Sequence, residues 1–232
     1  MYWNTEADFV ETFISSAQPI FKIRKNNKIA VWREFKTGYG RPDIVFVEYN
    51  PSVIESRKAN SVFTPLPNLA AYTISYLSGK PWVTEERLSR FLNCYGSTFY
   101  KVLNELTQRG LIERNNHLVK AKARSEIMAV HRLWVFEAKL NHWKDAVDQA
   151  ERHLWFTKDS YILLPYKSGL LTESIKYECS KRGVGLAFFD LENGYQTILQ
   201  PAQSGFLNSP LLWLINERLW EEKQNEHGSV CT

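Results

Sequence analysis

The hydrophobic pattern of the chain changes its periodicity twice, and this limits the folds open to it. Residues 28–48 contain short apolar runs separated by turn residues, which indicates β-strands. Residues 68–109 instead carry apolar side chains at helical spacing, with very short connections between segments. Strands and helices then alternate again over residues 133–191. We therefore expect an α/β domain whose sequence is interrupted by a separate, mainly helical domain.

Three elements are expected to open the α/β part. A helix is predicted over Glu6–Ala17, because Thr5 can cap it and its apolar residues fall on one face. Strands are predicted over Lys28–Phe35 and Asp43–Glu48, joined by the glycine- and proline-containing turn of residues 37–42. Both strands are rich in apolar residues, so the sequence predicts a sheet packed on the helix.

The interruption has the element order of a winged helix-turn-helix. Residues 51–62 are polar and basic without periodicity, and we interpret them as a linker. The helices that follow are predicted over Asn68–Leu77, Thr84–Asn93 and Ser97–Arg109. A two-stranded ribbon is then predicted over Leu111–Val119, with its turn at Asn115–Asn116. Three helices followed by a small hairpin are typical of a winged helix.

The rest of the chain is expected to complete the sheet. Its predicted strands are Leu133–Leu140, Ser160–Leu164 and Val184–Leu191, and its predicted helices are residues 141–156, Leu171–Arg182 and Pro210–Lys223. We therefore expect a discontinuous α/β core formed by residues 1–62 and 126–232. Residues 63–125 would form the inserted winged helix, since inserted domains join their hosts at exposed sites.

Composition excludes several classes of protein. The 232 residues are 44% hydrophobic and 14% aromatic, which allows a packed core and excludes wholesale disorder. Cys94, Cys179 and Cys231 include no Cys-x-x-Cys pair, so neither a disulfide framework nor a thiolate zinc site is expected. With no signal peptide and no long apolar run, we expect a cytoplasmic protein without a membrane partner. The net charge of +4 permits nucleic-acid binding without requiring it.

Three charged residues of the α/β part are candidates for catalysis. Asp43 follows a Gly-Arg-Pro turn at the entry to a buried strand. Glu137 and Lys139 lie two residues apart in the next strand of the core, so they share one face of it. Two carboxylates suit a hard cation such as Mg²⁺ or Mn²⁺, and the lysine can position or activate the attacking water. Each short motif is common by chance, and Asp43 could equally hold the backbone of its own turn.

The order of elements around these residues resembles the PD-(D/E)XK nuclease superfamily, whose restriction-endonuclease-like core is α-β-β-β-α-β. Pro42-Asp43 matches the first half of the family motif, and Glu137-Ala-Lys139 matches the second. The resemblance covers roughly residues 5–50 and 130–191. It implies a mixed central sheet flanked by helices. The two halves of the motif lie further apart than is usual in the family, and the winged helix accounts for the excess.

The resemblance also implies an activity and further site residues. It implies a metal-dependent DNA endonuclease in which Asp43 and Glu137 bind the metal and Lys139 acts on the attacking water. Members often add a glutamate from the first helix, for which Glu6 is favoured because it points toward the apolar face; it could equally only cap the helix. Gln149 matches a glutamine that several relatives place at the active site, and it could equally be a boundary residue. His153, one turn later, is interpreted as structural.

The predicted winged helix supplies candidate DNA contacts. The third helix begins with hydroxyl groups and a cation that suit a DNA groove, namely Ser97, Thr98, Tyr100 and Lys101. Cations follow in and after the hairpin that suit phosphate contacts, namely Arg109, Arg114, Lys120, Lys122 and Arg124. Winged helices also bind proteins, and this alternative stays open.

Three functions follow from these patterns. The first is a metal-dependent endonuclease acting in DNA defence, mobile-element processing or repair. The second is a non-catalytic DNA-binding regulator that uses the nuclease-like core as a scaffold. The third is a nuclease subunit of a transposition-type complex, in which the winged helix binds a partner protein. A homodimer is a further expectation, for which the helix containing Trp213, Leu214 and Trp220 offers an apolar face.

Overall fold

The computed structural model describes residues 3–17, 21–38, 40–57, 65–166, 170–202 and 208–228. The described part is a mixed α/β protein that divides into two compact units. Unit 1 comprises Met1–Tyr49 and Arg132–Leu207, and unit 2 comprises Asn50–His131 and Asn208–Thr232. Within the described ranges no helix is long and apolar enough to cross a membrane.

Unit 1 is built on a six-stranded mixed sheet with the strand order β1-β2-β6-β7-β8-β9. Its strands are β1 (Lys28–Arg33), β2 (Ile44–Tyr49), β6 (Val130–Ala138), β7 (Asp159–Pro165), β8 (Gly185–Asp190) and β9 (Gly194–Leu199). Its helices are α1 (Glu6–Ala17), α7 (Trp143–His153) and α8 (Leu170–Arg182). The β6–β7 and β7–β8 pairs are parallel, whereas β1–β2 and β8–β9 are antiparallel. The predicted mixed central sheet flanked by helices is thus confirmed.

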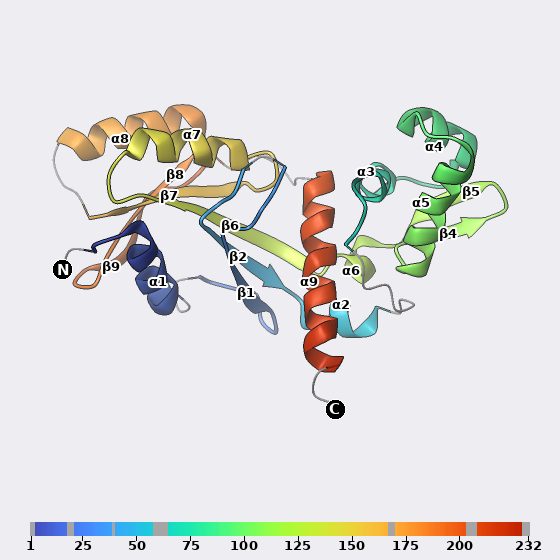
Figure 1. The fold of residues 1–232 in the computed structure, drawn as a ribbon, viewed down its shortest axis with the longest axis horizontal. Coiled ribbons are helices and arrows are strands. Elements are labelled where there is room, and N and C mark those ends of the chain that lie inside the picture. Colours follow the sequence, from blue (N-terminus) through green and yellow to red (C-terminus); the bar gives the residue numbers. More distant parts are fainter. Residues whose placement is uncertain are drawn as a thin grey trace. The chain divides into compact units, whose positions relative to one another are not determined.

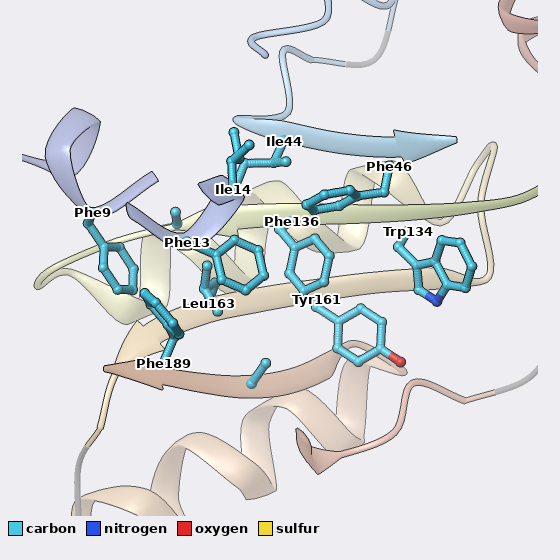
Figure 2. Close-up of a cluster of buried hydrophobic side chains, with 12 residues drawn as sticks. Phe9, Phe13, Ile14, Ile44, Phe46, Trp134, Phe136, Tyr161, Leu163 and Phe189 are labelled. Carbon is cyan, nitrogen blue, oxygen red and sulfur yellow. The ribbon is translucent and has the colours of Figure 1, made fainter. Parts of the chain in front are cut away.

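Helices cover both faces of this sheet (Figure 1). On one face, Phe9 and Phe13 of α1 pack on alternate residues of the central strands, such as Phe136 and Leu163 (Figure 2). On the other face, α7 and α8 pack on the residues between them, such as Ile162. The near-continuous apolar runs of β2 and β7 follow from this arrangement, because both faces of these strands are buried.

The start of α1 follows the sequence prediction. The hydroxyl of Thr5 accepts a hydrogen bond from the backbone N–H of Asp8 at 3.1 Å, which caps the helix as expected. The apolar residues of α1 lie over the sheet, which leaves Glu6 in the first turn at the end of the helix nearest Lys139. The helix therefore presents a carboxylate at one end of the sheet.

Unit 2 consists of helices with a separate three-stranded sheet of order β3-β5-β4. Its helices are α2 (Pro51–Ser56), α3 (Asn68–Leu77), α4 (Glu85–Leu92), α5 (Gly96–Gln108), α6 (Arg124–Ile127) and α9 (Pro210–Gly228). Its strands are β3 (Val83–Thr84), β4 (Ile112–Asn115) and β5 (Leu118–Ala121). The three predicted helices and the hairpin are present with ends shifted by one or two residues, and the short β3 adds a third strand.

The interpretation of residues 51–62 as a linker is wrong over the part that the structure describes. Residues 51–56 form α2, and residues 58–62 lie outside the described ranges. Asn50 caps α2 by accepting a hydrogen bond from the backbone N–H of Ser52, and Pro51 occupies the first helical position. An Asn-Pro pair ends a strand, and it also begins a helix.

The division between the units also differs from the one predicted at 62/63 and 125/126. The predicted core segment 126–232 includes α9, but α9 packs on α3 in unit 2. The side chain of Asn216 in α9 accepts hydrogen bonds from the backbone N–H groups of Ala129 and Val130. The same amide donates to the carbonyl oxygen of Ile127 at 2.9 Å. The C-terminal helix therefore belongs to unit 2, together with residues 50–62 that were also assigned to the core.

Candidate functional site

The first half of the candidate motif meets the second at the end of β6. Asp43 closes the turn before β2, and its Oδ2 accepts a hydrogen bond of 2.8 Å from the backbone N–H of Ala138. Farther along, the backbone N–H of Asn50 donates to the carbonyl oxygen of Ala129, so β2 and β6 run in opposite directions. This antiparallel arrangement brings the beginning of β2 to the end of β6 and places Asp43 beside Glu137 and Lys139.

Lys139 follows the last residue of β6 and contacts two carboxylates. Its Nζ lies 2.9 Å from Oε2 of Glu6 and 3.9 Å from Oδ2 of Asp43. The Lys139 side chain is only 18% exposed, which limits where the ammonium group can move. The structure thus brings Glu6 to the site, where it forms an ion pair with the lysine.

Glu137 is buried deeper than the other charged residues of the site. Its side chain is 3% exposed, and its Oε1 lies 2.5 Å from Nε2 of His153, which is 1% exposed. Sequence reasoning took His153 as structural and missed this contact. The position of His153, one turn after Gln149 at the edge of the apolar face of α7, could have indicated that its side chain faces the sheet.

Burial and like charge perturb both carboxyl groups. Burial, followed by the charge of Glu137, raises the pKa of Asp43 to about 6. Burial raises the pKa of Glu137 to about 7, although a side-chain hydrogen bond with Asp43 works in the opposite direction. For Lys139, burial lowers the pKa, but the hydrogen bond to Glu6 and the charge of Asp43 give a net increase. The site thus holds adjoining acids with too little positive charge to keep both ionised.

The donor set fits a divalent cation with hard oxygen ligands. Asp43 and Glu137 are carboxylates that lie close enough for the charge of Glu137 to raise the pKa of Asp43. No group of three or more His, Cys, Asp or Glu side chains within the described ranges is arranged to hold a metal ion. Two carboxylates are nevertheless a common protein contribution to a Mg²⁺ site, where water and substrate phosphate oxygens supply the other ligands. Asp43 and Glu137 therefore fit such an ion in the presence of a phosphate substrate.

Gln149 does not join this hydrogen-bonded cluster. It lies on α7, and within the described ranges its buried Oε1 has no hydrogen-bond partner. In the described part of the chain, no hydrogen bond or ion pair links it to Asp43, Glu137 or Lys139. Its predicted role at the active site therefore stays a prediction.

The residues predicted to contact DNA differ in their surroundings. Those at the start of α5 are exposed, namely Ser97, Thr98, Tyr100 and Lys101. Lys120 and Lys122 are half-buried, and Nζ of Lys120 lies 5.9 Å from the centre of the Trp82 ring. Arg114 forms an ion pair of 2.8 Å with Glu85, so part of its charge is already compensated.

Arg109 was placed among the surface cations, and this is wrong. Its side chain is fully buried, with Nε 2.7 Å from Glu105 and Nη1 3.0 Å from Glu221. A guanidinium group in such surroundings cannot reach a phosphate. Arg109 therefore stabilises unit 2 and belongs to no binding surface.

Comparisons of the chain with protein-family models, with curated proteins and with solved structures gave no match. The function is therefore inferred from the residues of the site and their geometry. In unit 1 that geometry is an acidic pair beside a lysine, placed where the end of β6 meets the turn before β2.

Proposed function

We propose that the protein is a metal-dependent nuclease that hydrolyses phosphodiester bonds of DNA at Asp43, Glu137 and Lys139. One observation carries the proposal. A Pro-Asp turn and a Glu-x-Lys strand end, far apart in the sequence, are joined by the hydrogen bond from the N–H of Ala138 to Asp43. An acidic pair deficient in positive charge, with a lysine beside it, suits the binding of a metal and a phosphate.

The fold supports the same proposal. In chain order, α1, β1, β2, β6, α7 and β7 give the series α-β-β-β-α-β. This is the series of the restriction-endonuclease-like core, with the elements α2 to α6 of unit 2 lying between β2 and β6 in the sequence. Helices α3, α4 and α5 followed by the β4–β5 hairpin support a winged helix in unit 2.

Each side chain has a distinct role in the proposed reaction. Asp43 and Glu137 would hold Mg²⁺ or Mn²⁺, which supplies charge neutralisation at the phosphate and a bound water of lowered pKa. Lys139 keeps its ammonium group in one place, because Glu6 accepts a hydrogen bond from it at 2.9 Å. From there Lys139 can orient the attacking water or stabilise the negative charge that develops on the phosphate oxygens.

DNA is the proposed substrate because unit 2 offers exposed groups suited to a duplex. The start of α5 presents Ser97, Thr98 and Lys101 to solvent, and the hairpin adds the half-buried Lys120. Phosphate contacts of this kind position a protein on DNA without reading the base sequence. DNA defence, mobile-element processing and repair are the settings that such an enzyme would serve.

Cleavage assays with matched variants test the chemistry. Supercoiled plasmid, linear duplex and single-stranded DNA are incubated with the protein in Mg²⁺, Mn²⁺ or EDTA. We expect metal-dependent cleavage that falls by at least about a hundredfold in Asp43→Asn, Glu137→Gln and Lys139→Ala, by analogy with the loss of one transition-state contact. Glu11→Gln is the control, because Glu11 is an exposed acid of α1 paired with Arg33 outside the site.

The outcomes separate the alternatives. Site variants that cleave like the wild type make the carboxylates structural and refute the nuclease. Wild-type protein that binds DNA but cuts none of the substrates with any metal favours the regulator. Cleavage that needs a second protein favours the subunit of a transposition-type complex.

Salt-dependent binding to an uncleaved duplex tests the DNA contacts. Replacing Lys120 and Lys122 together by alanine should lower the slope of log K against log salt by about two, since each phosphate contact contributes about one. Arg114→Ala should change the slope less, because Glu85 already compensates its charge. Unchanged slopes in both variants would assign the winged helix to a protein partner.

A further inference from the structure

We propose that His153 is a positioning residue for Glu137, donating a hydrogen bond from Nε2 to Oε1 and so fixing the carboxylate for metal binding. What the carboxylate then does rests on the proposed function. The contact itself rests on the structure, in which these two atoms are 2.5 Å apart and both side chains are at most 3% exposed.

The tautomer of His153 follows from its hydrogen bonds. Metal binding requires Glu137 as an ionised carboxylate, which only accepts hydrogen bonds, so in that form the proton of this contact belongs to Nε2 of the imidazole. The other ring nitrogen, Nδ1, is buried and has no hydrogen-bond partner among the residues that the structure describes. A proton on Nδ1 would therefore be an unsatisfied buried donor, which costs stability. The ring is thus neutral, with Nε2 as its only donor.

The surroundings of His153 hold the ring in one orientation. Phe156 packs against it edge to face, with ring centres 5.6 Å apart. Gly40 also packs closely on the ring, since a Cβ built on Gly40 would lie 3.3 Å from Cε1 of the histidine. Gly40 also has φ +137°, a conformation that residues with a Cβ rarely adopt. Little free space is left for the imidazole to rotate.

The same turn serves both carboxylates. Gly40 lies against His153, and three residues later Asp43 accepts its hydrogen bond from Ala138. Each acid is therefore held by one neutral donor, Asp43 by a backbone N–H and Glu137 by an imidazole N–H. Oε1 of Glu137 contacts His153, so metal coordination would use the other carboxylate oxygen, Oε2. Without the histidine, repulsion between the two carboxylates would turn Glu137 away from Asp43.

Manganese binding measured in the absence of DNA tests this role. Isothermal calorimetry or electron paramagnetic resonance gives the Mn²⁺ affinity, and kcat and KM are measured on plasmid. We expect His153→Leu to weaken Mn²⁺ binding 10- to 100-fold and to lower kcat, the usual effect of losing a partner of a metal ligand. KM for DNA should not change. His153→Gln keeps an N–H donor and should recover most of the affinity, and His142→Asn controls for loss of an exposed histidine at the start of α7.

A structural role alone would give a different result. If both His153 variants melt at lower temperature but the folded protein binds Mn²⁺ like the wild type, the positioning role is overturned. Wild-type protein that binds no Mn²⁺, either alone or with a DNA duplex present, overturns the proposed function instead. Should His153→Leu not fold, the ¹⁵N chemical shifts of the wild-type imidazole still decide the matter. A neutral ring protonated at Nε2, whose signal shifts in Glu137→Gln, supports the proposal, and a ring protonated at Nδ1 refutes it.

Discussion

Each of the two units contains a buried group of charged side chains, but only the one in unit 2 is balanced. There Arg57 donates two hydrogen bonds of 2.6 Å to Glu217, whose side chain is fully buried. Arg109 adds a contact of 3.4 Å to the same carboxylate and one of 3.0 Å to Glu221. Every charge in this cluster faces an opposite charge, which is the condition under which buried ions can be tolerated.

The acidic site of unit 1 lacks this balance. Asp43 and Glu137 adjoin each other, and the nearest ammonium group, that of Lys139, is shared with Glu6. Both carboxyl groups consequently have raised pKa values, of about 6 and about 7. The comparison indicates that compensated buried charge in this protein maintains the structure. Uncompensated buried charge is where we expect a ligand to supply the missing charge.

The largest expected effect comes from breaking the balanced cluster. Glu217→Gln would leave the buried guanidinium groups of Arg57 and Arg109 without their shared counter-charge. We expect the free energy of unfolding, measured by urea denaturation, to fall by about 3–5 kcal/mol. Glu86→Gln removes the exposed partner of Arg90 and should change it by less than about 1 kcal/mol. Equal losses of stability in Glu217→Gln and Glu86→Gln would show that the buried cluster stabilises unit 2 no more than an exposed ion pair does.

Binding of a cation should stabilise the acidic site of unit 1, which lacks positive charge. Mn²⁺ at a hundred times its dissociation constant should raise the free energy of unfolding of the wild type by about 2.7 kcal/mol. Glu137→Gln should gain little, because one of the two carboxylates is lost. Thermal unfolding with and without Mn²⁺ measures both. A similar gain in the variant would place the metal elsewhere.

The smallest expected effect is a gain in stability and depends on pH. The folded-state pKa of Asp43, about 6, is above its ordinary value of 3.8, so ionisation of Asp43 opposes folding. This penalty is absent below about pH 4 and grows as the pH rises through about 6. Without metal, Asp43→Asn should therefore be more stable than the wild type at pH 7.5, by about 2 kcal/mol, and equal to it at pH 4.

Glu11→Gln serves as the control of opposite sign. The hydrogen bond and charge of Arg33 hold the pKa of Glu11 below its ordinary value, so its ionisation favours folding slightly. Melting curves from pH 4 to pH 7.5 should show no gain for this exposed residue at any pH. A loss of stability in Asp43→Asn at pH 7.5 would contradict the interpretation of the acidic pair as uncompensated.

Local patterns explain what could be predicted from the sequence. Thr5 and the apolar face of residues 6–17 specify α1, and the alternation of β6 places Glu137 with Lys139. Asp43 follows turn residues before an apolar run, which is also a local signal. To predict that Glu6, Asp43 and Glu137 lie near Lys139, only the order of the helices and strands in a known type of sheet was needed in addition.

The features that could not be predicted depend on contacts between distant residues. Glu217 meets Arg57 across 160 positions, and His153 reaches Glu137 from a different element. The apolar pattern of α9 does not show which helix or sheet it packs against, so its assignment to the core was wrong. Strand β9 was missed although a local signal for it exists. Asn193-Gly194 is a hairpin turn pair that predicts a further strand after β8.

The position of α9 in unit 2 fixes an order of events during translation. Arg57 leaves the ribosome 160 residues before Glu217, an interval on the order of 10 s at ordinary elongation rates. Throughout that time the cluster lacks its central carboxylate, and the apolar face that α9 covers is open to chaperones. A nascent chain stopped short of residue 217 therefore carries a second unit that cannot close, which makes such fragments natural targets for proteolytic quality control.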